Sequence, residues 1–138
     1  MLLLINTADP ATSTIALGED DGRVLASHVG PSRRGERDAL LSAVERCLRR
    51  ARRSLPDVRG VAVVTGPGPF SGLRAGIATA NAIGFALGVP VVGMSATDAP
   101  TPKAFAATAA ERFRGARVGA FVAPEYGAEP HITIKRKA

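Results

Sequence analysis

GPGPFSGLRAG, residues 66–76, is the stretch of sequence that decides the fold. Glycine and proline alternate at its start, and such a run forms a stiff turn because proline fixes its own backbone angle and glycine adopts angles that other residues avoid. A buried-type strand is predicted before the turn, at 58–65, and a helix of mostly small residues after it, at 73–87. The turn therefore joins a strand to a helix, which is the unit from which parallel sheets are built.

Strands and helices alternate on both sides of this unit. The predicted elements are, in chain order, strands at 1–6, 12–17 and 24–29, a helix at 38–53, the strand and helix just described, a strand at 89–94, a helix at 103–114 and a candidate further strand at 117–122. The order βββαβαβα predicts an α/β fold with a mixed sheet, antiparallel in the opening meander and parallel where right-handed crossovers are needed. This order resembles the ribonuclease-H-like half of the actin, hexokinase and heat-shock chaperone superfamily, which is the fold that we expect.

Composition favours one compact domain with a core of small aliphatic residues. The chain has 138 residues, of which 46% are hydrophobic and only 4% aromatic, with no Trp. The single Cys47 excludes an internal disulfide, and neither it nor His28 and His131 lies in a metal-ligand motif, so we expect no metal and no tightly bound cofactor. The short apolar start is not a secretory signal and no long apolar run follows, so a cytoplasmic protein without a membrane contact is expected.

Positive charge is concentrated in a few places along the chain. The net charge of +6 comes largely from Arg33, Arg34 and Arg37, from the run at 46–53 and from the basic residues at 135–137. Nucleic acid is therefore a candidate partner. A solvated helix face is the alternative that we favour, because no aromatic residues for base stacking are interleaved with these charges.

The helix predicted at 73–87 is apolar on two sides. The residues expected to face the sheet are Leu73, Gly76, Ile77, Ala80, Gly84 and Leu87, and those on the opposite side are Ala75, Ala78, Thr79, Ala82, Phe85 and Ala86. A helix that is apolar all round must be covered. The cover is either a partner or another part of this chain, namely the helix at 38–53 or the one at 103–114.

Residues 66–76 closely resemble the signature GPGSFTGLRIG of the TsaB (YeaZ) family, and the flanking segments 61–65, 77–80 and 88–95 extend the resemblance. It covers residues 1–96, which form the expected TsaB-like N-terminal domain. An additional helix and candidate strand are expected at 97–122, and a basic C-terminal tail at 123–138. Members of the family usually have two related domains, so the second lobe is expected to be missing.

The resemblance implies a non-catalytic scaffold subunit of the complex that makes N6-threonylcarbamoyladenosine (t6A) in tRNA. Its partners would be a TsaD-like paralogue or a second copy of itself, a TsaE-like ATPase, and tRNA through the complex. TsaD binds metal through a histidine pair that this chain lacks. The family pairs through its first two helices, which predicts an interface made of Leu41, Leu48, Arg74, Ala75, Ala78, Thr79, Ala82 and Phe85.

The signature loop has two interpretations. Residues that could contact an anion or a nucleotide phosphate at the helix start are Gly66, Gly68, Phe70, Ser71 and Gly72. Pro67 and Pro69 have no N–H to donate, and no lysine follows, so we favour a structural turn in which Ser71 caps the helix. Any bound nucleotide would then lie at a partner interface.

Two other functions remain as alternatives. One is a tRNA-binding module that uses the arginines at 46–53 and the tail lysines. The other is an enzyme, either a small acyl or phosphoryl transferase or a glycoprotease-like protein, that uses the loop and Asn6. Asn6 stands where kinases of the superfamily carry an aspartate, and Ser71 has no His or Lys near it in sequence, so the enzyme is the weaker alternative.

Overall fold

The computed structural model describes residues 1–31, 37–119 and 122–123. Its elements are β1 (Leu2–Asn6), β2 (Thr12–Gly18), β3 (Val24–Pro31), α1 (Arg37–Ala51), the 3-10 turn η1 (Leu55–Asp57), β4 (Gly60–Gly66), α2 (Phe70–Leu87), β5 (Val91–Ser95), the 3-10 turn η2 (Ala96–Asp98) and α3 (Pro102–Arg112). The predicted order of strands and helices is confirmed. No helix in this part of the chain has both the length and the apolar character needed to cross a bilayer.

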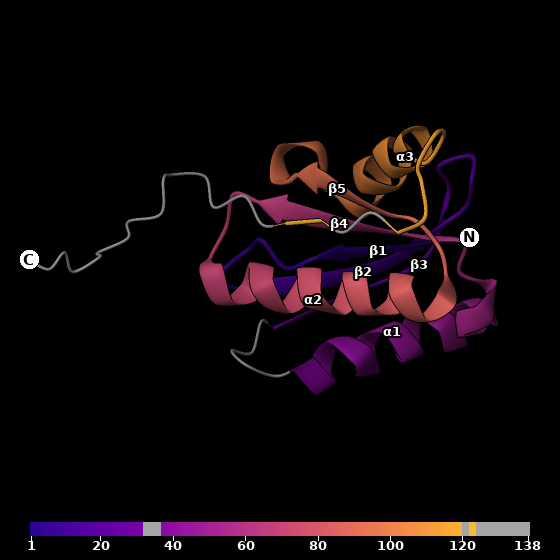
Figure 1. Ribbon diagram of the computed structural model, residues 1–138. Helices are drawn as coiled ribbons and strands as arrows, with labels where there is room; N and C mark the ends of the chain where they lie inside the picture. Colours follow the sequence, from indigo (N-terminus) through magenta and orange to yellow (C-terminus); the bar gives the residue numbers. More distant parts are fainter. Residues whose placement is uncertain (32–36, 120–121, 124–138) are drawn as a thin grey trace, which may run out of the picture.

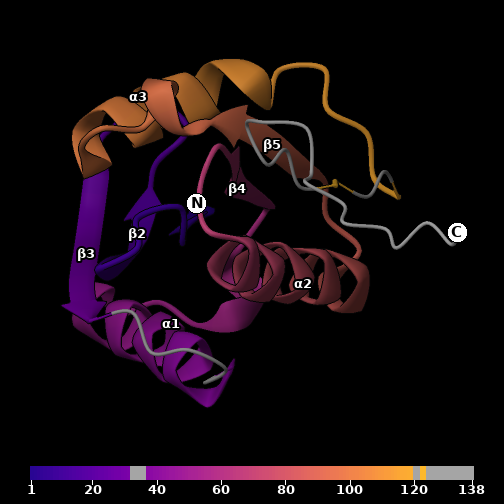
Figure 2. The ribbon, with the colours of Figure 1, turned by 90° about the vertical axis from the view of Figure 1, so that its left-hand side faces the viewer.

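The five strands form one mixed sheet in the order β3-β2-β1-β4-β5. β2 runs antiparallel to both β1 and β3, whereas β1, β4 and β5 run parallel. Helices α1 and α2 lie on one face of the sheet and α3 lies on the other (Figures 1 and 2). The predicted α/β arrangement, a meander followed by parallel crossovers, is therefore confirmed.

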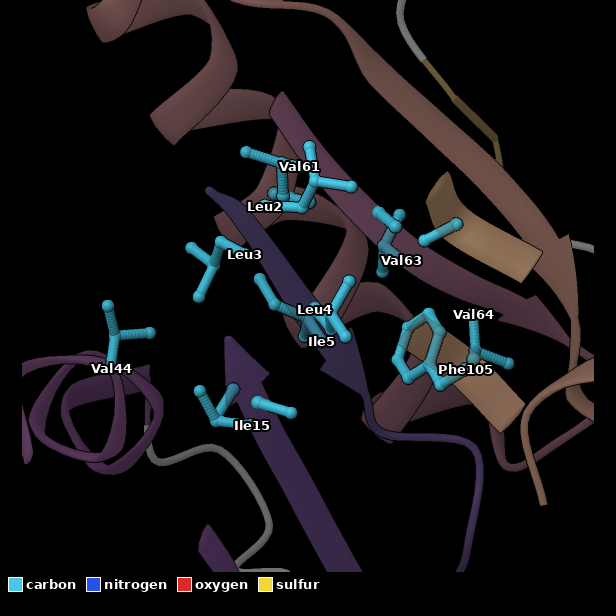
Figure 3. Packing of buried hydrophobic residues seen from close by; sticks show 14 of the residues in the cluster. Leu2, Leu3, Leu4, Ile5, Ile15, Val44, Val61, Val63, Val64 and Phe105 are labelled. Carbon is cyan, nitrogen blue, oxygen red and sulfur yellow. The ribbon is translucent and has the colours of Figure 1, made fainter. Parts of the chain in front are cut away.

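The core lies on both faces of the central strands. Because helices cover both faces, β1 and β4 are apolar along nearly their whole length instead of alternating. Val44 of α1 packs toward Leu3 and Ile15 on one face, and Phe105 of α3 lies beside Val64 on the other (Figure 3). Because aromatic residues are few, the core consists mainly of closely packed Val, Leu, Ile and Ala side chains.

Helix α2 begins three residues earlier than predicted. Pro69 is the residue before its first turn, with φ −63° and ψ 139°, and the Leu73 N–H donates to the Pro69 carbonyl oxygen at 3.0 Å. Ser71 therefore lies inside the first turn, and no side chain caps this helix, so the predicted Ser71 cap is wrong. At the other end Gly88 ends the helix as predicted, in the left-handed conformation with φ 67°.

The end of the chain only partly lies within the described residues. Of the candidate strand at 117–122, the described residues hold a turn at 118–119 and no strand. His131 and the lysines at 135–137 lie outside the described residues, as do Arg33 and Arg34. The proposed basic tail is therefore a prediction from sequence alone.

Cys47 is expected to be unreactive in the folded protein. Its side chain is fully buried in α1, Sγ lies 3.5 Å from the Ile15 carbonyl oxygen, and burial raises the pKa of the thiol. The reactive thiolate is therefore scarce at neutral pH. An aromatic disulfide reagent should titrate no thiol in buffer at pH 7.5 and one thiol in urea. Rapid reaction in buffer would mean that α1 opens readily.

Candidate functional site

The outer face of α1 and α2 carries an open groove of about 550 Å³ between the two helices. Its lining residues are Leu41, Val44, Glu45, Leu48, Arg49, Arg53, Leu55 and Ile83. Leu41 at the rim is 47% exposed, whereas Leu48 and Ile83 are buried and form the floor. An apolar floor with a charged rim is the usual composition of a protein-binding groove.

A line of exposed residues runs along α2 beside this groove. Arg74, Ala78, Ala82 and Phe85, which we call the α2 stripe, follow one another at helical spacing and are all exposed. Phe85 is 81% exposed. The Arg74 guanidinium lies over the Phe70 ring, 5.1 Å from its centroid, which holds both side chains at the start of the stripe.

Two residues predicted to face outward on α2 do not. Thr79 is only 9% exposed and its hydroxyl donates to the Ala75 carbonyl oxygen at 2.8 Å, while Ala75 is half-buried. Thr79 lies one turn before Ile83, which lines the α1–α2 groove, so this side of α2 is turned toward α1. The expectation of an outward-facing Thr79 is wrong because α1 crosses closer to α2 than the sequence pattern reveals.

Neither of the helices considered as an internal cover reaches the α2 stripe. α3 packs on the opposite face of the sheet (Figure 2). α1 covers only one flank of α2. On the other flank the Asn81 side-chain amide exchanges two hydrogen bonds with the backbone of Val122, at 3.1 and 3.2 Å. Within the described residues the α2 stripe therefore stays open to solvent.

The signature loop packs directly against the chain that leaves β1. A Cβ on Gly68 would lie 2.5 Å from the Ala8 carbonyl oxygen, and one on Gly72 would lie 2.7 Å from the carbonyl oxygen of Thr7. A Cβ on Gly76 would likewise collide with the side chain of Thr7. The four-residue spacing of these glycines places the start of α2 on the Thr7–Ala8 backbone.

Polar side chains at the end of β1 complete this contact. Thr7, which is 3% exposed, donates its hydroxyl to the Gly72 carbonyl oxygen at 2.7 Å. The Asn6 carboxamide accepts from the Ala8 N–H at 3.0 Å and donates to the Ala99 carbonyl oxygen at 3.4 Å. Asn6 therefore ties β1 to the segment after η2. Across the described residues, no group of three or more His, Cys, Asp or Glu side chains is placed to hold a metal ion.

The arginine run at 46–53, which begins in α1 and continues just past its end, does not form one continuous patch. Arg50 donates to the Ser27 carbonyl oxygen at 3.0 Å, and Arg53 donates to the Glu19 carboxylate at 3.3 Å. Arg49 lines the α1–α2 groove, and Arg46 lines a separate cavity. Because the helix turns by about 100° per residue, consecutive arginines point in different directions.

The sequence analysis missed that second cavity, which has a volume of about 220 Å³. His28 of the edge strand β3 lines it together with Arg46 of α1. The two residues are 18 positions apart and belong to different elements, so no local motif joins them. Only the antiparallel pairing of β2 and β3, with Ile15 opposite His28, places the imidazole on the α1 side.

Comparison with known proteins identifies the relatives of this chain. The family model of TsaD, tRNA N6-adenosine threonylcarbamoyltransferase, matches residues 31–113. An uncharacterised protein of Mycobacterium tuberculosis, Rv3421c, is 41% identical over 98 residues, which cover 71% of this chain and 46% of that protein. The tRNA N6-adenosine threonylcarbamoyltransferase of Geotalea uraniireducens is 32% identical over 110 residues, covering 68% of this chain and 32% of the enzyme.

A solved structure shows the same likeness. YeaZ from Pseudomonas aeruginosa superposes with a TM-score of 0.61 and 34% sequence identity, over 68% of this chain and 43% of YeaZ. The chain thus spans less than half the length of these relatives. The family-model match, residues 31–113, includes α1, the signature loop and α2. The chain belongs to the TsaD family of domains and is a YeaZ-like (TsaB-like) member of it.

Proposed function

We propose that this chain is a scaffold subunit of the machinery that makes t6A in tRNA and that it binds a TsaD-like paralogue through the α1–α2 face. The observation that carries the proposal is the open α2 stripe beside an apolar groove. Phe85 is 81% exposed on it, and the described residues supply no cover. A patch of this kind marks an interaction surface.

The partner is expected to present a pair of helices of its own. The small side chains of Ala78 and Ala82 let another helix approach closely, and Leu41 and Phe85 flank them with large apolar side chains. A paralogue with the same fold offers a matching helix pair, and so does a second copy of this chain. The rim of the groove is charged, with Glu45, Arg49 and Arg53. It would favour whichever of these two partners has the complementary charges.

The geometry of the signature loop supports a role without chemistry. Its glycines are packed against the Thr7–Ala8 backbone, and Asn6 is engaged by two backbone groups. Pro67 and Pro69 have no N–H to offer a phosphate, so the loop lacks the row of donors that a phosphate cradle needs. The tRNA-binding alternative receives no comparable support, because Arg50 and Arg53 are engaged within the fold and the tail lies outside the described residues.

The isolated chain is expected to show no turnover and to stimulate its partner. Purified chain alone should neither hydrolyse ATP nor form t6A on tRNA. The chain should raise the yield of t6A when it is added to the TsaD-like paralogue, the TsaE-like ATPase, threonylcarbamoyl adenylate and tRNA. Mass spectrometry of the nucleosides measures this yield. Turnover by the chain alone would contradict the scaffold role. An unchanged t6A yield on its addition would contradict the partnership.

A further inference from the structure

The cavity lined by His28 and Arg46 is separate from the α1–α2 groove, and none of its described lining residues also lines the groove. It lies on the α1 side of the sheet, near the end of β1 and the first turns of α1 and α2. Its lining residues are Thr7, Ser13, Ile15, His28, Gly30, Pro31, Ala39, Leu40, Ser42, Ala43, Arg46 and Gly72. Four elements and the end of β1 therefore contribute to it.

The polar groups of this cavity suit an anion. Arg46 and His28 supply nitrogen donors from two different elements, and Ser13 and Ser42 supply hydroxyl donors. No carboxylate is among the lining residues, which lie within the described part of the chain. Among the described residues, the polar side chains that line this cavity can therefore donate hydrogen bonds, and none of them is acidic.

Two further observations support the same assignment. Within the described residues neither Arg46 nor His28 makes a hydrogen bond or ion pair, whereas Arg50 on the same helix and Arg53 just after it are both engaged. The imidazole of His28 lies over Gly30, where a Cβ would come 3.1 Å from Nε2. Gly30 therefore leaves room for the ring at the cavity wall.

Size limits what the cavity accepts. At about 220 Å³ it is smaller than the roughly 300–1,000 Å³ of typical small-molecule sites, so it fits a group of a few heavy atoms but not a whole nucleotide. The first turn of α1, where Ala39 and Leu40 line the wall, adds the partial positive charge of a helix N-terminus. We propose that this cavity binds a small oxyanion, a phosphate or carboxylate group, held between Arg46 and His28.

Isothermal titration of the full chain with inorganic phosphate tests this assignment, with acetate as the carboxylate probe at matched ionic strength. Binding should be saturable, and Arg46→Ala should weaken it by about tenfold or more, because a charge-assisted hydrogen bond is lost. His28→Ala should also weaken binding. Arg49→Ala is the matched control, since it removes the same charge from the same helix but lines the other groove, and it should change the affinity less than about twofold.

The two probes separate the sources of the anion. Tighter binding of phosphate would assign the site to phosphate groups, and tighter binding of acetate would assign it to carboxylates. Thermal melts in parallel show whether each variant is folded, and phosphate should raise the melting temperature of the parent chain but not of Arg46→Ala. Equal losses in Arg46→Ala and Arg49→Ala, or no saturable binding of either probe, would overturn the proposal.

Discussion

The Ala82→Glu variant is expected to lose binding to the TsaD-like paralogue while it keeps a cooperative thermal melt. Ala82 lies in the middle of the α2 stripe and is exposed, so the folded monomer tolerates a carboxylate there. In a dry interface the same carboxylate loses its hydration without gaining a partner, at a cost of about 3 kcal/mol or more, which weakens binding at least about a hundredfold. Pull-down and titration with the paralogue measure the loss, and circular dichroism monitors the fold.

Ala107→Glu is the matched control for this experiment. Ala107 is an exposed alanine on α3, on the opposite face of the sheet, so the same substitution there should leave partner binding unchanged. If Ala82→Glu unfolds the protein, the stripe is internal core. If it is folded and still binds, the partner docks elsewhere.

Gly76→Ala is expected to destabilise the chain although alanine favours helices. The new Cβ would press on the Thr7 side chain, whose hydroxyl is bonded to the Gly72 carbonyl oxygen. Overpacking and loss of that hydrogen bond cost about 3 kcal/mol together, and the better helix propensity of alanine returns about 1 kcal/mol. The free energy of unfolding in urea should therefore fall by about 2 kcal/mol.

A double-mutant cycle shows whether the contact with Thr7 is the cause. Thr7→Ala removes the atoms that the new Cβ would meet, so the pair Thr7→Ala with Gly76→Ala should cost less than the sum of the two single variants. Additive losses would mean that Gly76 acts through another contact. The cycle also tests whether the glycines of the signature loop serve to pack α2 on the end of β1.

The order of the elements could be predicted because the signals that define it are local. Periodicity separates the strands from the helices, and Gly88 marks the end of α2. The predicted start of α2 is too late because a cap at Ser71 begins the helix after that residue, whereas Pro69 already has the extended conformation that precedes a helix. Because Ser71 follows Pro69 by only two residues, the sequence does not show which of the two precedes the first helical turn.

The candidate site was predicted less completely because burial depends on neighbours that are distant in sequence. The exposure of Ala78, Ala82 and Phe85 agrees with the helical pattern, but that of Thr79 depends on how α1 crosses α2. The cavity of His28 and Arg46 depends on strand pairing and on the approach of α1 to the sheet. The hydrophobic periodicity of a single helix or strand predicts neither the burial of Thr79 by α1 nor the cavity between β3 and α1.

Protection of single thiols tests the central claim, that the α2 stripe is a protein interface, most directly. Since Cys47 is buried, Ala78→Cys and Ala107→Cys each place one reactive thiol, on the stripe and on α3 respectively. With the TsaD-like paralogue bound, the thiol at position 78 should react at least about tenfold more slowly, because an interface core excludes water and reagent, while the thiol at 107 should react as before. A stable complex in which the thiol at 78 reacts at the rate of the free chain would contradict the account.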